Sequence, residues 1–164
     1  SRLGKTVLWA GARDTRFAMV LASVSGEGGA AISRRNFGET VAHISDPSRY
    51  HYWWAPRYHT YSNDVSKMPI DGHMLVALIA PRPLLLQTGS TDHWSDPKGE
   101  FVSAVAAEPV FRLFGQSGPG TTVMPAPGDR SLSMNRLGWY MHDGGHAVLP
   151  EDWKLFIEYM TKHL

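Results

Sequence analysis

Apolar runs of two kinds alternate along this chain, and the alternation constrains the fold more than any other feature of the sequence. Residues 84–88 (LLLQT) form a short apolar run bounded by turn residues, which predicts a buried strand, whereas residues 70–80 (IDGHMLVALIA) have the length of a helix. Strands that alternate with helices form parallel sheets covered by helices. The sequence therefore predicts an α/β fold, a three-layer sandwich in which helices flank a parallel sheet.

Proline and capping residues set the helix boundaries. Asp71 caps the helix that Pro81 ends, and Asp96 followed by Pro97 starts another. We expect two apolar stripes to face the core, Leu3, Val7, Leu8 and Gly11 in the first helix, and Trp153, Phe156, Ile157, Met160 and Leu164 in the last. The expected elements are helix 2–12, strand 18–23, a short helix in 30–37, helix 70–80, strand 84–88, helix 96–114, a short strand beginning at Met124, strand 137–141 and a helix from Pro150.

Two stretches depart from this alternation. Residues 115–136 are rich in Gly, Pro and Ser and are expected to be mainly loop. Residues 40–68 sustain no period but are rich in Tyr and Trp, which argues against disorder, so we expect an ordered excursion beside a binding cleft. About three strands are few for an open sheet. We therefore expect residues 1–164 to form one partial domain, the C-terminal half of a larger α/β domain.

Composition excludes several classes of protein. The net charge of +1 argues against a nucleic-acid partner, which requires a concentrated basic surface. The absence of cysteine excludes disulfides and thiolate metal sites. No apolar run approaches the ~18 residues of a membrane span, and no signal peptide is visible.

The first five residues, SRLGK, have the form of half a nucleophile elbow. In that device a serine lies on a tight strand-to-helix turn, with glycines two places before and after it. Here Leu3 takes the second place and Gly4 follows. Ser1 alone is a weak signal, and we expect it to be first only because the chain was cut there.

Two later loops offer partners for Ser1 in the order typical of α/β hydrolases, which is Ser, then Asp or Glu, then His. Asp92 follows the strand LLLQT, and His146 follows the strand LGWYM within DGGH. Taken singly, each has an ordinary explanation: Asp92 could close a turn, and His146 is one of 8 histidines. Their joint placement at strand ends favours a catalytic triad.

Several ordered motifs resemble the glucuronoyl esterases of carbohydrate esterase family 15, in the α/β-hydrolase superfamily, most closely their bacterial branch. These motifs are SRLGK with TVLWAGA, SGEGGAA (25–31) with RRNFGE (34–39), HML (73–75) with LIAPRPL (78–84), DHWSDPKGEF (92–101) and GH (145–146). The resemblance covers nearly the whole chain. It implies a serine esterase that cleaves esters of (4-O-methyl-)glucuronic acid linking glucuronoxylan to lignin, with no metal or organic cofactor.

The resemblance also implies roles for individual residues. Ser1 is the nucleophile, His146 the general base, and Arg2 stabilises the oxyanion beside backbone N–H groups. Lys5, Glu39 and Trp94 are implied to contact the sugar; without the resemblance, their ordinary interpretations are a solvated lysine, a helix-surface glutamate and a core tryptophan. The family further implies a secreted or periplasmic bacterial protein, which we expect to be a monomer with no membrane partner.

One position departs from the family pattern. Many members carry a glutamate acid directly before the Ser-Gly of the second motif, where this chain has Val24. Glu27 is close in sequence but does not match that position. We therefore expect Asp92 to be the acid of the triad.

Three alternatives remain at the level of the sequence. One is a generic α/β-hydrolase esterase of other specificity. Another is an N-terminal nucleophile, in which the α-amine of Ser1 is the base and Asp92 and His146 are idle. The last is an inactive fragment or a carbohydrate-binding module.

Overall fold

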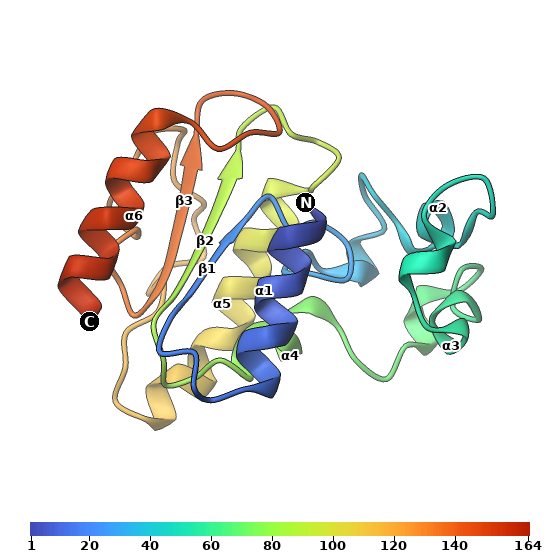
Figure 1. The fold of residues 1–164 in the computed structure, drawn as a ribbon, viewed down its shortest axis with the longest axis horizontal. Coiled ribbons are helices and arrows are strands. Elements are labelled where there is room, and N and C mark those ends of the chain that lie inside the picture. The colour runs from blue at the N-terminus through green and yellow to red at the C-terminus, as the bar shows by residue number, and fades with distance from the viewer.

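A computed structural model describes all residues 1–164 and contains a three-stranded sheet between two layers of helices (Figure 1). The strands are all parallel, in the order β1-β2-β3, which confirms the predicted fold class. The elements are α1 (Arg2–Arg13), β1 (Val20–Ser23), η1 (Ser33–Arg35), α2 (Val41–Ser45), η2 (His51–Trp53), α3 (Pro56–His59), η3 (Val65–Lys67), α4 (Gly72–Ala77), β2 (Leu84–Gly89), α5 (Pro97–Leu113), β3 (Leu137–His142) and α6 (Pro150–His163).

The two faces of the sheet have separate apolar cores. Leu84 and Leu86 of β2 point to one face, where they pack with residues of α1, α4 and α5 such as Leu8 and Phe101. Leu85 points to the other face and packs against α6. Figure 1 shows α6 on one side of the strands and α1, α4 and α5 on the other. Successive residues of β2 therefore pack alternately against the two layers of helices.

The strand register brings the loops after β1, β2 and β3 to one edge of the sheet. Ser23 pairs with Gln87, and Gly89 pairs with His142, so the three carboxyl ends are aligned. In open α/β sheets this edge is where ligands bind. The first turn of α1 reaches the same edge, because Gly4 packs against the Ser23 carbonyl.

The predicted apolar stripe of α1 is only partly correct. Leu8 is fully buried and Gly11 is buried, but 72% of Leu3 is exposed. The inward face is instead made by Gly4, Lys5, Leu8 and Gly11. The two glycines leave room for β1, since a side chain at Gly11 would overlap Val20, and this close approach rotates Lys5 inward.

The predicted stripe of α6 is wrong in the same way. Phe156 is buried, but 58% of Trp153 and 57% of Ile157 are exposed. Leu155 and Tyr159, which the stripe omitted, pack against the sheet. Residues one helical turn apart share a face, and the buried one here is centred on 155 and 159.

Three smaller predictions also need correction. No strand begins at Met124, because Pro125 and Pro127 remove two N–H donors that a ladder would need. Only residues 33–35 of the expected helix in 30–37 form a helical turn. Asp96 precedes α5 as predicted but does not cap it with its side chain, since the carboxylate binds Arg35 at 2.7 Å.

The aromatic segment 40–68 is ordered and folds into short helical turns, α2, η2, α3 and η3, set apart from the sheet (Figure 1). Within it, Trp54 and Tyr58 stack with ring centroids 4.5 Å apart.

None of the helices of the chain combines the length and apolar character that crossing a bilayer requires.

Candidate active site

Ser1 begins the site at the N-terminus of α1. It occupies the N-cap position, yet its side chain makes no capping hydrogen bond, so the hydroxyl is not engaged by the helix. Its backbone nitrogen lies 3.2 Å from Nε2 of His146. The first N–H groups of a helix have no intrahelical partner, so α1 directs free donors towards this place.

Asp92 and His146 form the central contact of the site. Asp92 Oδ2 lies 2.8 Å from His146 Nδ1, and only 2% of the Asp92 side chain is exposed. The carboxylate accepts the Nδ1–H, which leaves Nε2 with its lone pair facing Ser1. The structure thus brings together the three residues that the sequence placed in loops at separate strand ends.

Ser95 is a residue of this site that the sequence reasoning missed. Its N–H donates to Asp92 Oδ1 at 3.2 Å, so both carboxylate oxygens have a partner. Its hydroxyl lies 3.2 Å from His146 Nδ1 and donates to the carbonyl of Val24 at 3.3 Å. The available signal was Asp92 itself, because an aspartate in a turn commonly accepts a hydrogen bond from a backbone N–H a few residues later.

Neither Val24 nor Glu27 is placed to be the acid of a triad. Val24 adopts a left-handed backbone conformation (φ 44), which is strained for a β-branched residue. The carboxylate of Glu27 accepts hydrogen bonds from Ser33, from the hydroxyl of Tyr58 at 2.5 Å and from Gly28 N–H at 3.1 Å. Burial raises the pKa of Glu27. Glu27 therefore anchors the aromatic segment rather than His146.

The three expected sugar contacts lie close together, but two of them are already paired. Lys5 Nζ donates to Glu39 Oε2 at 2.8 Å and to the carbonyl of Ser25 at 2.6 Å, and both charged side chains are buried. The N–H of Glu39 donates to the carbonyl of Trp94 at 2.7 Å. Trp94 is 37% exposed, and its ring already contacts Arg49, whose guanidinium carbon lies 5.6 Å from the ring centre, and the ring of His43.

Glu100 is a second residue that the sequence reasoning missed. It is completely buried in the first turn of α5, where its Oε1 accepts from Ser25 Oγ at 2.7 Å and from Gly26 N–H at 2.8 Å. Its other oxygen has no partner. Burial raises the pKa of Glu100 to about 7, against the opposing effect of these hydrogen bonds and of Lys5. Glu100 therefore fixes the loop whose Ser25 carbonyl binds Lys5.

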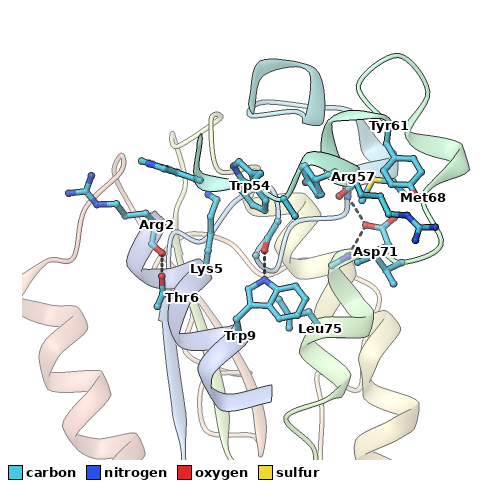
Figure 2. A pocket seen from close by; sticks show the side chains of 18 of the residues that line it. Arg2, Lys5, Thr6, Trp9, Trp54, Arg57, Tyr61, Met68, Asp71 and Leu75 are labelled. Atoms are coloured by element: carbon cyan, nitrogen blue, oxygen red, sulfur yellow. Dashed lines mark hydrogen bonds between the residues drawn. The ribbon is translucent and has the colours of Figure 1, made fainter. Parts of the chain in front are cut away.

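Two cavities meet at Arg2. One of about 530 Å³ contains Ser1 and Val24, and the other of about 1140 Å³ extends along α1 to the aromatic segment. Figure 2 shows the larger one, with Trp9 and Lys5 on α1 facing Trp54 and Arg57. The guanidinium carbon of Arg2 lies 5.9 Å from the centre of the Trp53 ring, within cation–π range. The smaller cavity is the one that contains the expected nucleophile.

No group of three or more His, Asp or Glu side chains is arranged to hold a metal ion.

The sequence model described as "Glucuronyl esterase, fungi" matches residues 1–115. Carbohydrate esterase MZ0003, from an unknown prokaryotic organism, is 45% identical over all 164 residues, which cover 37% of its length. 4-O-methyl-glucuronoyl methylesterase 1 of Wolfiporia cocos is 32% identical over 120 residues, 70% of this chain and 29% of that protein.

Solved structures agree with these sequence relatives. A promiscuous CE15 esterase from a marine bacterial metagenome superposes with a TM-score of 0.94 at 45% identity, covering 100% of this chain and 40% of that one. A CE15 glucuronoyl esterase from Teredinibacter turnerae gives a TM-score of 0.92 at 42% identity, covering 99% of this chain and 39% of that one. The chain thus spans well under half the length of these relatives.

Proposed function

Because this chain belongs to the glucuronoyl esterases of carbohydrate esterase family 15, α/β hydrolases, we propose that it carries the hydrolytic groups of an enzyme that cleaves esters of glucuronic acid. The observation that carries the proposal is the 2.8 Å contact of Asp92 with His146 Nδ1, with Nε2 of the same imidazole 3.2 Å from the backbone nitrogen of Ser1. The glucuronate ester is supported by relatives named 4-O-methyl-glucuronoyl methylesterase.

The proposed reaction has two acyl transfers. The hydroxyl of Ser1 attacks the ester carbonyl as its proton passes to His146 Nε2, and the carbon–oxygen bond to the alcohol then breaks as the alkoxide takes that proton. Water attacks the acyl-enzyme in the second step as His146 takes one of its protons. His146 then returns that proton to Ser1 Oγ as the bond between Oγ and the acyl carbon breaks, which releases the glucuronic acid. Asp92 holds the imidazole in the tautomer that accepts these protons.

We assign stabilisation of the negative charge that develops on the carbonyl oxygen to Arg2 and to backbone N–H groups in the first turn of α1. A guanidinium remains charged at all working pH values, and the contact of Arg2 with Trp53 supports its placement beside the smaller cavity.

We assign sugar binding to the surface beside Trp94, where the partly exposed indole edge and the Arg49 guanidinium over its ring can contact a sugar. Lys5 already donates to two acceptors, so it has one N–H left for a sugar hydroxyl. Esters that join glucuronoxylan to lignin alcohols are the proposed natural substrates. Because such a polymer does not enter cells, a secreted or periplasmic location of a monomeric bacterial enzyme is part of the proposal.

The test compares two esters with the protein produced from its complete gene. We expect turnover of a methyl ester of 4-O-methyl-glucuronic acid at a kcat/KM well above that for p-nitrophenyl acetate. Ser1→Ala and His146→Ala should each lower kcat by about 10³-fold or more, with a smaller effect on KM. Absence of glucuronate ester hydrolysis by the unsubstituted protein would overturn the proposal.

A second candidate is an esterase of broader specificity. The pairing of Lys5 with Glu39 favours it, since buried and paired groups give a sugar few polar contacts. A relative described as promiscuous, 45% identical along the whole chain, also supports it. Equal kcat/KM on the glucuronate and acetate esters would favour this candidate.

A further inference from the structure

A second histidine–aspartate pair lies beneath the loop that carries His146. His142 is the last residue of β3 and Asp152 lies in the first turn of α6; both are buried. His142 Nδ1 lies 2.9 Å from Asp152 Oδ2. Neither residue lines the cavity that contains Ser1, and the proposed reaction uses neither.

The pair holds the His146 loop on both sides of that residue. His142 Nε2 lies 3.0 Å from the carbonyl oxygen of Gly145, the residue directly before His146. Asp152 Oδ2 accepts the N–H of Leu149, three residues after it, at 2.7 Å. A loop fixed at both ends has little freedom to move the imidazole between them.

The sheet fixes the pair in turn. The side chain of Gln87, on β2, packs against His142 with its amide nitrogen 2.9 Å from Nδ1. Since this amide donates to the carbonyl of Thr88 and Nδ1 faces the Asp152 carboxylate, the contact is a packing contact. Gly89, the last residue of β2, has no room for a side chain, because an added Cβ would overlap the carbonyl of Gly145. His142 is therefore wedged between the sheet, α6 and the turn that leads to His146.

We propose that His142 and Asp152 are positioning residues for His146, which set the distance of its Nε2 from Ser1. The proposal rests on the proposed function, in which that distance governs proton transfer. Displacement of a catalytic group by about 1 Å can lower a rate about 100-fold, so even a small shift of the loop has a measurable effect.

The experiment compares variants of the two residues in the protein produced from its complete gene. His142→Gln keeps an N–H close to the place of Nε2, whereas His142→Asn keeps one close to the place of Nδ1. We expect kcat to fall about 10- to 100-fold in His142→Asn and in Asp152→Leu with KM nearly unchanged, and to fall less in His142→Gln.

Tyr159→Phe is the matched control. Tyr159 is a fully buried residue of the same helix and donates to the carbonyl of Arg136 at 2.7 Å, at the opposite end of β3 from the His146 loop. We expect this variant to lower Tm and to leave kcat unchanged. If the His142 variants keep the original kcat, or lose it only in proportion to the folded fraction, the positioning role is wrong.

These outcomes are distinct from a failure of the proposed function. If the unsubstituted protein hydrolyses another ester instead of the glucuronate, the same variants are compared on that ester. The comparison of kcat between His142→Asn and His142→Gln then still tests whether the contact with Gly145 positions His146.

Discussion

Asp92 Oδ2 and His146 Nδ1 lie 2.8 Å apart although the two residues are separated by 54 positions in the chain. The contact forms because β2 and β3 are parallel neighbours, with Gly89 paired to His142, so that the loops after them leave the sheet side by side. The geometry of the sheet therefore places the carboxylate of Asp92 against the imidazole of His146.

Removal of the charge on Asp92 tests its assignment as the acid. In Asp92→Asn the amide can present a donor to His146 Nδ1 and favour the wrong tautomer, so we expect kcat to fall by about 10³- to 10⁴-fold. Steady-state kinetics on the glucuronate ester measure this. Glu27→Gln is the comparison, with less than about a tenfold loss expected, because Glu27 binds Ser33 and Tyr58. The reverse order would refute the assignment.

The buried pair of Lys5 and Glu39 predicts a non-additive effect on stability. Lys5→Met leaves the Glu39 carboxylate buried without its cation, and we expect a loss of about 3–5 kcal/mol in the free energy of unfolding. The double variant Lys5→Met/Glu39→Met should lose less than the sum of the single variants. Urea unfolding measures all three. Arg16→Met, which breaks an exposed pair with Asp14, should change stability by less than about 1 kcal/mol.

Glu100 predicts a dependence of stability on pH. Its pKa is raised to about 7 from 4.5, so between these values the folded protein binds more protons than the unfolded chain. The stabilising contribution is complete below pH 4.5 and is lost as the pH rises through 7, by at most about 3 kcal/mol. Glu100→Gln should flatten the slope of the free energy of unfolding between pH 5 and 8. Glu27 contributes in the same direction in both proteins, so the difference isolates Glu100. Identical slopes would contradict the prediction.

Gly4 predicts a link between packing and catalysis. A side chain at Gly4 would overlap the backbone carbonyl of Ser23, so Gly4→Ala should push the first turn of α1, and Ser1 with it, away from β1. We expect a lower Tm and a fall in kcat of about tenfold or more. Gly11→Ala, on the same helix, would meet side-chain atoms of Val20 and Ile79. That variant should lower Tm while kcat of the folded protein changes little. Equal losses of kcat in the two variants would contradict the prediction that packing at Gly4 sets the position of Ser1.

The order of the sheet strands and of the helices that cover them (α1, β1, α4, β2, α5, β3, α6), and the joint placement of Ser1, Asp92 and His146, were predictable from the sequence. Apolar runs and proline positions fixed the strands, and parallel strands have their loops at one edge. The inward turn of Lys5 was not predictable, because it follows from the close packing of Gly4 and Gly11 on β1 rather than from any periodicity of apolar residues.

The burial of several polar residues was the second feature that could not be predicted from the sequence. Glu100, His142 and Asp152 are all nearly or completely buried, yet each stands in a stretch where a polar residue is ordinarily assigned to the surface. Their burial depends on partners far away in the chain, such as Gly26 for Glu100 and Gln87 of the neighbouring strand for His142. Such pairings are visible only once the strands are in register.

The anchoring of the aromatic segment by Glu27 separates two parts of the molecule that can change independently. The hydrolytic groups stand at the N-terminus of α1 and in the loops after β2 and β3, whereas Trp53 and Trp54 reach the cavities from a segment held through Tyr58. Insertions or replacements in residues 40–68 that keep Trp53, the ring beside Arg2, can therefore reshape the entrance for a new alcohol or sugar while the distance between Ser1 and His146 is preserved. Divergence of substrate preference among related enzymes is expected to concentrate in this segment.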